Sequence, residues 1–333
     1  MSEYLLYGAL GSPYSLKVRA ALRAKRLPHR WISVNPVTRG EVAGKVKVPV
    51  IPIIQCPDDS WANDSTPFLL DLDKNEPSRP LIPSNPLMRF ACLLIEDMAD
   101  EWLTKAMFHY RWHYAADAEQ MSHWLMYDNR PDASLQEIDD LAAEFANRQI
   151  SRMALVGCTP ETKPMIEASS DRIQDILNRG AVGGSRFLFG HIPSIADMAL
   201  YGQLWQMRSD PTPAAHMRQN FPYLFRWLEH VDDASGTDEG WQSDCSDTVQ
   251  GLLAVAGDTY LPFLLANYTA LERGETEFEV TIENGNFRQG CFKYQAKCLL
   301  NMRKEWAALS EKDRGTLSVY LGAGAGILSD AIS

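Results

Sequence analysis

Two short polar motifs near the start of the chain have the residue types and spacing of a binding site for a small charged ligand. Ser12-Pro13 opens a run with helical periodicity, so the Ser12 hydroxyl would lie at a helix N-terminus. Free N–H groups and the positive end of the helix dipole favour an anion there, and a bound thiol would ionise more easily. Asp64-Ser65 opens a second helical run, where Ser65 suits a carboxylate and Asp64 suits an ammonium group.

Ser12-Pro13-Tyr14-Ser15 resembles the Cys-Pro-Tyr-Cys motif of thioredoxin-like redox proteins, with serine at both cysteine positions. Without those cysteines the motif cannot carry out its own disulfide exchange. The six cysteines of the chain form no CxxC pair, and we interpret them as small buried apolar residues of a protein in a reducing, cytoplasmic location.

A third motif, Val48-Pro49, opens an apolar run that is typical of a strand. In thioredoxin-like folds a proline at this point is typically cis, and Val48-Pro49 resembles that pattern. Such a turn would leave the main-chain N–H and C=O of Val48 free to pair with an extended peptide ligand. We therefore predict that Val48 and Pro49 belong to the same site as Ser12.

The elements that must position these motifs alternate between strand and helix. Hydrophobic patterning predicts strands at 4–7, 31–34, 48–54 and 61–62, and helices at 13–26 and from 64 onward. The loop between Asn35 and Lys47 is short for a further helix. This order predicts a small α/β layer fold, thioredoxin-like, over residues 1–80.

A proline-rich linker at 79–86 marks a domain boundary, and the chain beyond it is mostly helical. We expect an all-helical domain over 87–235, with helices at 87–128 (one or two), 134–156, 163–179, 195–207 and 221–230. Within it, Ser194 and Asp197 form a capping box at the start of a helix.

Residues 240–333 form an extension whose role the sequence does not assign. A helix is expected at 251–272, a β-hairpin around Asn284-Gly285, and helices near 293–309 and 311–321. The glycine-rich stretch from Leu321 to Gly326 lacks the strand–turn–helix context of a phosphate loop, so we expect a flexible tail.

Four motifs in this order, across about residues 4–232, resemble the glutathione transferase superfamily, and Ser12 to Arg19 looks most like its serine-type tau and zeta classes. The resemblance implies glutathione as co-substrate, with Ser12 stabilising its thiolate and Val48, Pro49, Asp64 and Ser65 holding it. Lys47, or as an alternative Lys45, would meet one of its carboxylates. A small hydrophobic electrophile would bind against the helical domain, and the residues that we expect to line its pocket are Tyr14, Phe108 and Trp112.

Several alternatives remain open at this stage. Tyr7 is a rival thiol-activating hydroxyl, although a packed strand residue is the simpler interpretation. Ser12 alone could be a helix cap, and Asp64-Ser65 a turn and cap. The chain could also be a non-catalytic binding protein of the same fold, or a glutathione-dependent isomerase or dehalogenase. The resemblance makes a homodimer possible.

Other features narrow the functional classes. Residues 1–80 carry 11 Lys and Arg against 8 Asp and Glu, whereas the whole chain has a net charge of −11, so we expect no nucleic-acid partner. No stretch approaches the ~20 continuous apolar residues that a membrane span needs, so we expect no membrane association. Most basic residues between Lys17 and Lys47 are interpreted as a solvated face. His109 and His113 share a helix face, but no third ligand follows by spacing, so we expect no metal.

Overall fold

The N-terminal part of the protein is built on one four-stranded sheet. The structure, a computed structural model, describes residues 3–237 and 240–329. The strands follow the order β2-β1-β3-β4, with β1 and β2 parallel and the other neighbours antiparallel. Their bounds are β1 Tyr4–Gly8, β2 His29–Ser33, β3 Ile53–Gln55 and β4 Trp61–Asn63. The predicted α/β arrangement is confirmed.

Three helices accompany this sheet: α1 Pro13–Ala24, α2 Pro36–Val42 and α3 Ser65–Asn75. Helix α1 makes the crossover between the parallel strands, and Pro13 occupies its first turn, where a missing N–H costs nothing. Helix α2 corrects the expectation that the loop after Asn35 is too short for a helix. A reciprocal capping box between Asn35 and Thr38 satisfies its first N–H groups and allows seven residues to close into a helix.

The strand predicted over 48–54 begins only at Ile53, and the prediction of a cis bond at Val48-Pro49 is wrong. The cis peptide bond is Ile51–Pro52, which leads directly into β3. The carbonyl of Val48 accepts hydrogen bonds from the N–H of Val50 (2.8 Å) and from Asn63 Nδ2 (2.7 Å). Val48 therefore belongs to an exposed turn ahead of the strand.

The second part is helical, as predicted, and its helices are α4 Pro86–Met98, α5 Thr104–His113, α6 Ala115–Asn129, α7 Leu135–Ile150, α8 Lys163–Gly180, α9 Ile195–Ser209, α10 Pro211–Asn220 and α11 Pro222–Asp232. A π-helical turn, η1 Ala99–Leu103, joins α4 to α5, and a 3-10 turn, η2 Ala154–Val156, follows α7. Helix α10 was not predicted. The Ser194–Asp197 capping box at the start of α9 is confirmed.

The extension after residue 240 adds elements to the helical part. They are α12 Asp247–Val255, the π-helical turn η3 Ala256–Tyr260, α13 Leu261–Glu272, the hairpin β5 Glu277–Ile282 and β6 Gly285–Gly290, α14 Lys293–Ala307, α15 Glu311–Leu321 and α16 Gly324–Ser329. The hairpin is confirmed. The expectation of a flexible tail is wrong over 324–329, because Gly324 lies against Gly257 so closely that a Cβ would come within 2.5 Å of its backbone.

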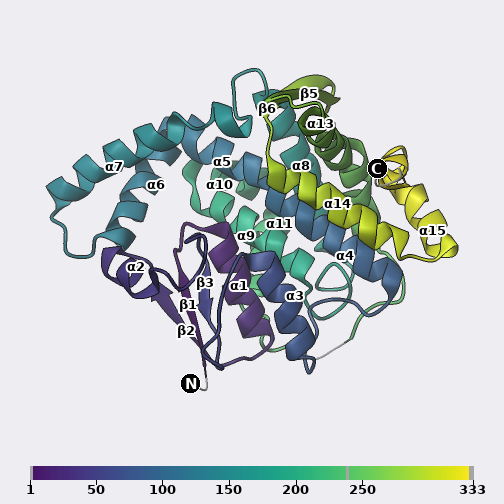
Figure 1. Cartoon of the computed structure of the whole chain (residues 1–333), viewed down its shortest axis with the longest axis horizontal. Helices are drawn as coiled ribbons and strands as arrows, with labels where there is room; N and C mark the ends of the chain where they lie inside the picture. Colours follow the sequence, from purple (N-terminus) through teal and green to yellow (C-terminus); the bar gives the residue numbers. More distant parts are fainter. Residues whose placement is uncertain (1–2, 238–239, 330–333) are drawn as a thin grey trace.

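One hydrophobic core joins the three parts of the chain. It contains Leu16 of α1, Ile95 of α4, Leu200 of α9, Phe263 of α13 and Leu299 of α14, all at most 1% exposed. Figure 1 shows α14 lying along α4, with the N-terminal sheet at the other side of the molecule. The extension is therefore packed into the body of the protein.

The helix that runs without a break through α12, η3 and α13 is 26 residues long and apolar enough to cross a membrane by length and composition alone. In this fold, 61% of its most apolar window is buried inside the protein, as in a core helix.

Candidate active site

Ser12 lies at the start of α1 and lines a cavity between the N-terminal sheet and the helical part. Its side chain caps the helix by accepting a hydrogen bond from the N–H of Ser15 (3.3 Å). A hydroxyl that accepts this bond keeps its own proton available for a ligand in the cavity. Capping the helix and donating to a ligand are therefore compatible roles for Ser12.

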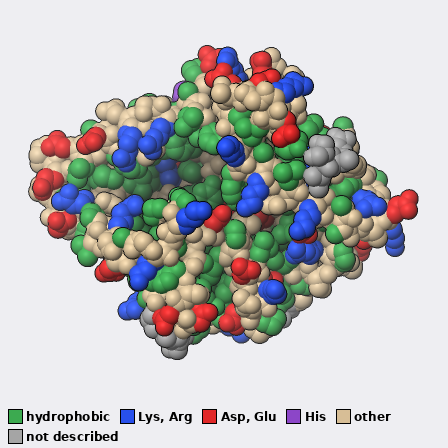
Figure 2. Space-filling view, viewed as in Figure 1, with side chains coloured by type: hydrophobic (Ala, Val, Ile, Leu, Met, Phe, Trp, Pro, Cys, Tyr) green, Lys and Arg blue, Asp and Glu red, His purple; other side chains and the backbone are tan. Residues whose placement is uncertain are grey.

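The cavity that Ser12 lines has a volume of about 280 Å³ and mostly apolar walls. Ser12 and Ile51 lie on the N-terminal side, and the predicted pocket residues Phe108 and Trp112 lie on α5. The remaining walls are Ala9, Gly11, Val34, Arg39, Met107, Arg111, Leu125, Met126, Asp128, Asn129, Phe145 and Gln149. Figure 2 shows this face hollowed between the arm of α6 and α7 and the N-terminal part, with hydrophobic side chains inside the hollow.

The third predicted pocket residue, Tyr14, lies in a neighbouring cavity of about 250 Å³. Phe108 lines both cavities, so the two adjoin at this residue. The Tyr14 hydroxyl donates a hydrogen bond to the carbonyl of Asp100 (3.0 Å), which holds the first turn of α1 against η1. The structure thus brings Phe108 and Trp112 to the cavity of Ser12 and places Tyr14 in the adjoining cavity.

Ile51 is a candidate site residue that the sequence analysis missed. It lines the cavity with Ser12, and within residues 3–237 and 240–329 neither its N–H nor its C=O has a hydrogen-bond partner. It therefore offers the free main-chain groups that were expected of Val48. The sequence contains two aliphatic–proline pairs, Val48-Pro49 and Ile51-Pro52. The pairing of Tyr7 with Ile53 in the sheet places the second pair at the edge of the site, and the sequence alone does not show this pairing.

Lys47, Val48 and Pro49 lie in an exposed loop, and none of them lines the cavity of Ser12. The nearby Lys45 lies over the ring of Trp61, with Nζ 5.7 Å from the ring centroid. The structure thus separates these three predicted ligand contacts from Ser12.

Asp64 and Ser65 stand together at the N-terminus of α3, as predicted. Asp64 has a positive φ of 72°, and Ser65 is 3% exposed. The Tyr294 hydroxyl, from the first turn of α14, lies 3.4 Å from Asp64 Oδ2. Burial and the charge of Asp64 raise the pKa of Tyr294, so its phenol remains protonated and acts as the donor.

The contact with Tyr294 shows that the extension reaches the candidate site. Phe292 and Gln295, on either side of Tyr294, line the cavity of Tyr14. Asn267 of α13 holds Phe292 through both main-chain groups, at 2.8 and 2.9 Å. No local pattern in the sequence indicates this contact, because Asp64 and Tyr294 are 230 positions apart.

Lys17 is fully buried, which corrects its interpretation as part of a solvated face. Its ammonium group pairs with Glu96 of α4 and with Asp100 of η1 (2.6 Å), and it also donates to Thr66 Oγ1 (3.1 Å). Burial lowers the pKa of Lys17, but the charges of Asp100 and Glu96 outweigh burial and the net pKa is raised. This buried network joins α1 and α3 to α4 and η1 of the helical part.

Lys25 is a second correction to the solvated face. It is 3% exposed and pairs with Asp73 (2.8 Å) and with the carbonyl of Arg79 (2.7 Å). A buried lysine needs such partners. Here they come from α3 and from the linker after it, and the sequence alone does not indicate that these segments lie next to the end of α1.

Three ionisable groups beside Asp100 have displaced pKa values. Burial raises the pKa of Asp97 to about 7, and the Tyr260 hydroxyl donates a 2.7 Å hydrogen bond to it. Burial and the charges of Asp97 and Asp100 raise the pKa of Glu101 to about 8. Burial lowers the pKa of Lys105 to about 8. Glu101 and Lys105 line the cavity of Tyr14.

The raised pKa of Asp97 predicts a dependence of stability on pH. The folded state holds this proton more tightly than the unfolded chain (pKa 3.8), so its contribution to stability is full below about pH 4 and is lost as pH rises through about 7. The free energy of unfolding should therefore decrease between pH 5 and pH 8. We expect this decrease to be smaller in Asp97→Asn by on the order of 1 kcal/mol. Urea unfolding at the two pH values measures it, and an unchanged pH slope would contradict the assignment.

Tyr7, the rival hydroxyl, is 6% exposed in β1 and packs against Trp61 with ring centroids 6.0 Å apart. It belongs to a small core with Leu5, Val34, Val42 and Ile53, and it does not line the cavity of Ser12. Burial raises the pKa of Tyr7. This environment favours the interpretation of Tyr7 as a packed strand residue.

His109 and His113 stack on each other with ring centroids 4.8 Å apart. His109 Nε2 lies 3.0 Å from Glu167 Oε1, which also accepts a hydrogen bond from the Tyr114 hydroxyl (2.7 Å). Across residues 3–237 and 240–329, no three His, Cys, Asp or Glu side chains are grouped to hold a metal ion.

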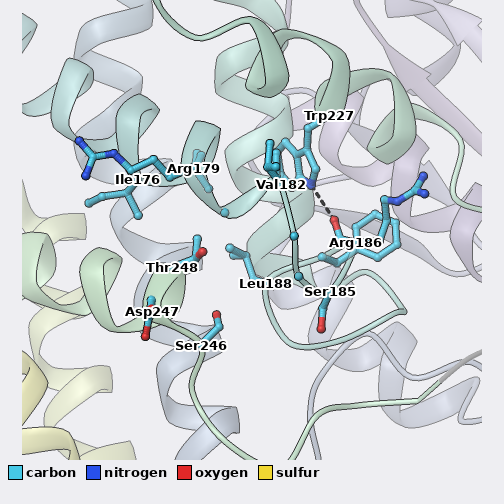
Figure 3. A pocket seen from close by; sticks show the side chains of 16 residues that line it. Ile176, Arg179, Val182, Ser185, Arg186, Leu188, Trp227, Ser246, Asp247 and Thr248 are labelled. Carbon is cyan, nitrogen blue, oxygen red and sulfur yellow. Dashed lines mark hydrogen bonds between the residues drawn. The ribbon is translucent and has the colours of Figure 1, made fainter.

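A larger cavity, of about 500 Å³, lies away from Ser12, between the end of α8, Trp227 of α11 and the start of α12. Figure 3 shows that Arg179 and Arg186 extend away from the hydroxyl groups at its centre. Arg179 pairs with Asp175 (2.7 Å), and Arg186 Nη1 lies 2.9 Å from His230 Nδ1. Both arginines already have partners, whereas Ser12 stands at a helix N-terminus on the wall of an apolar cavity, so we place the candidate site at Ser12.

Comparison with known proteins gives one family match. Residues 6–80 match the model of the glutathione S-transferase N-terminal domain. Among curated proteins, none matches this sequence significantly.

Several solved structures resemble the chain at low sequence identity. A glutathione S-transferase from Methylobacterium radiotolerans, in complex with glutathione sulfonate, is 20% identical, with 73% of this chain and 98% of that chain covered and a TM-score of 0.39. The glutathione transferase GSTFuA3 from Phanerochaete chrysosporium is 15% identical, with 72% and 98% covered and a TM-score of 0.49. The tau class glutathione S-transferase of mango, Mangifera indica, is 16% identical, with 72% and 94% covered and a TM-score of 0.42.

Proposed function

We propose that this chain, whose residues 6–80 match the model of the glutathione S-transferase N-terminal domain, binds glutathione and transfers it to a small hydrophobic electrophile. The observation that carries the proposal is the position of Ser12. Its hydroxyl stands at the N-terminus of α1 and on the wall of an apolar cavity, so it can donate to a thiolate beside a bound second substrate.

Glutathione would lie along the edge of the N-terminal part. Ile51, in place of Val48, would pair with its cysteinyl main chain, and Asp64 and Ser65 would hold the ammonium and carboxylate of its γ-glutamyl end. The positions of these residues support this pose, because Ile51 adjoins the cavity of Ser12 and Asp64 and Ser65 lie at a helix start. Lys47 remains a proposed partner of the glycyl carboxylate only if the exposed loop moves toward the ligand.

The reaction would be a substitution or an addition. The thiol proton leaves to solvent, and the thiolate sulfur forms a bond to an electrophilic carbon. In a substitution the leaving group departs with its electron pair. In an addition the π bond of the electrophile breaks, its electron pair moves to the neighbouring atom, and that atom takes a proton from solvent. Ser12 would contribute by stabilising the thiolate, and the walls with Phe108 and Trp112 by holding the electrophile next to the sulfur.

Calorimetric titration of the whole chain with glutathione tests the proposal most directly. We expect binding in the micromolar to millimolar range, and turnover of 1-chloro-2,4-dinitrobenzene that depends on glutathione. An absence of binding heat, together with an absence of protection against thermal unfolding, would contradict the proposal.

Asp64 provides a test of the pose. Asp64→Asn keeps the size of the side chain but removes the charge that would face the γ-glutamyl ammonium. We expect it to raise the dissociation constant of glutathione about tenfold, because a charge-assisted hydrogen bond is lost. Asp71→Asn, on the exposed side of α3, is the matched control. If the Asp64 and Asp71 variants bind glutathione with equal affinity, the γ-glutamyl end does not bind at Asp64.

A second candidate function, a binding protein without transferase activity, is supported by one observation. Tyr294 contacts Asp64, and Ser65 is 3% exposed, so the extension could cover the γ-glutamyl position. In that case Tyr294→Ala would increase the affinity for glutathione. If the extension is instead a wall of an open site, Tyr294→Ala leaves the affinity unchanged or lowers it, and calorimetry separates the two functions.

A further inference from the structure

The cavity of Ser12 continues into a second hollow between α6 and α7. This outer hollow has a volume of about 430 Å³ and is lined by Arg39, Met126, Asn129, Leu141, Glu144, Phe145 and Arg148. It shares Arg39, Met126, Asn129 and Phe145 with the cavity of Ser12. The two hollows therefore form one groove, which we call the substrate groove, with Ser12 at its inner end and Arg148 at its outer end.

The substrate groove carries two cationic side chains that lack acidic partners. Arg39 comes from α2 and Arg148 from α7, so they approach the groove from the N-terminal and the helical part respectively. Among the described residues neither forms an ion pair. Several exposed arginines elsewhere do, including Arg179 with Asp175, Arg226 with Glu229 and Arg288 with Glu277. Arg148 instead lies over the ring of Phe145, 5.0 Å from its centroid.

Two acidic side chains, Asp128 and Glu144, also line the groove. Asp128 lines the inner part, where burial raises its pKa, and Glu144 lines the outer part on the same helix as Arg148. Neither pairs with Arg39 or Arg148. Figure 2 shows Lys and Arg side chains around the hollow, whose interior is hydrophobic.

We infer that the second substrate is an amphipathic anion, whose apolar body lies in the substrate groove and whose carboxylate or sulfonate lies between Arg39 and Arg148. This inference rests on the proposed transferase function. The guanidinium group presents a planar pair of donors that matches such anions, and the apolar walls bury the rest of the molecule. The electrophilic carbon then faces Ser12, because Ser12 lines only the inner end of the groove.

The same chemistry has a second possible source, the glycyl carboxylate of glutathione. Arg39 lines the cavity of Ser12 and is within the part of the groove that glutathione would border. Arg148 lines only the outer hollow. The experiment therefore has to separate the two arginines and the two anions.

A matched pair of dyes provides the test. 8-Anilinonaphthalene-1-sulfonate and N-phenyl-1-naphthylamine share one aromatic body, and only the first carries an anionic group. Fluorescence titration of the whole chain, with saturating glutathione present, gives a dissociation constant for each dye. We expect Arg148→Gln and the double variant Arg39→Gln/Arg148→Gln to weaken sulfonate binding about tenfold, and to change binding of the neutral dye less than about twofold.

Arg179→Gln serves as the matched control, because Arg179 is an exposed arginine on the wall of the 500 Å³ cavity between α8 and α12. Sulfonate affinity that falls in the Arg179 variant and not in the Arg148 variant would place the anion site in that other cavity and overturn the inference. Equal losses for both dyes in the double variant would also overturn it, since the arginines would then act through packing.

Calorimetry with glutathione on the same variants distinguishes the remaining outcomes. If Arg39→Gln and Arg148→Gln weaken glutathione but not the sulfonate, both arginines serve the glycyl carboxylate and the inference fails while the transferase proposal stands. If glutathione does not bind to the unaltered chain but Arg148 still selects the sulfonate, the transferase proposal fails and the anion-binding groove stands.

Discussion

Replacement of Ser12 by alanine is expected to lower glutathione-dependent turnover about 100-fold, which is typical for the loss of one hydrogen-bond donor to a developing or bound anion. Glutathione affinity should remain nearly the same, because Ile51, Asp64 and Ser65 would still hold the peptide. The apparent pKa of the bound thiol should rise toward that of a free cysteine, about 8.5. The rate with 1-chloro-2,4-dinitrobenzene and the ultraviolet absorbance of the thiolate across pH measure both effects.

The alanine variant also loses the cap of α1, and a control must separate this structural effect. Loss of such a cap costs ~1 kcal/mol, which a thermal unfolding scan detects. Ser12→Thr keeps both the cap and the hydroxyl, so it should retain most of the turnover and the lowered thiol pKa. Tyr7→Phe should leave both unchanged. Full activity of Ser12→Ala, or a raised thiol pKa in Tyr7→Phe, would contradict the role of Ser12.

Replacement of Lys17 by methionine is expected to destabilise the fold by about 3–5 kcal/mol, because it leaves two buried carboxylates without their cation. Methionine keeps the unbranched apolar stem of the side chain, so the loss of packing is small. Glu96 and Asp100 both lie within hydrogen-bond distance of the Lys17 ammonium and come from the helical part. The variant should therefore loosen the contact between the two parts, and urea unfolding followed by tryptophan fluorescence measures the change.

The pH dependence of the Lys17 variant supplies an independent test. Burial, opposed by the charge of Lys17, already raises the pKa of Asp100 to about 6. Without the lysine this folded-state pKa rises further above the unfolded value of 3.8, so the variant loses stability as pH rises. We expect the deficit to be smaller at pH 5 than at pH 8.

Two controls complete the Lys17 experiment. The combined variant Lys17→Met/Glu96→Met/Asp100→Leu should recover much of the stability, because an apolar set of similar volume replaces the buried charges. Lys74→Met, at an exposed position of α3, should change stability by less than about 0.5 kcal/mol. A deficit in Lys17→Met that is no larger than that of Lys74→Met would show that the network does not stabilise the fold.

The structure places most of the elements where the sequence predicts them, because their signals are local. The N-cap serine and the proline after it define the start of α1, and Asn284-Gly285 closes the hairpin of β5 and β6. The capping box of Ser194 and Asp197 similarly marks α9. In each case one or two neighbouring residues satisfy the backbone groups, so no distant contact is needed.

The sequence predictions that the structure contradicts concern residues whose conformation or burial depends on a contact with a distant part of the chain. Val48-Pro49 and Ile51-Pro52 have the same local chemistry, and the pairing of β1 with β3 determines which of them enters the site. The glycine-rich end of the chain becomes helical because Gly324 packs on Gly257. Lysine is usually a surface residue, and Lys17 is buried only because α4 and η1 pack against α1.

The sequence by itself determined the α/β N-terminal part, its helical partner, and the placing of Ser12, Asp64 and Ser65 at helix starts, because helix caps, prolines and hydrophobic periodicity act over a few residues. Only the tertiary structure decided that Ile51 and Arg39 share a cavity with Ser12, that Lys17 is buried between two carboxylates, and that Tyr294 meets Asp64. These contacts depend on the packing of helices far apart in the chain, which local patterns do not encode.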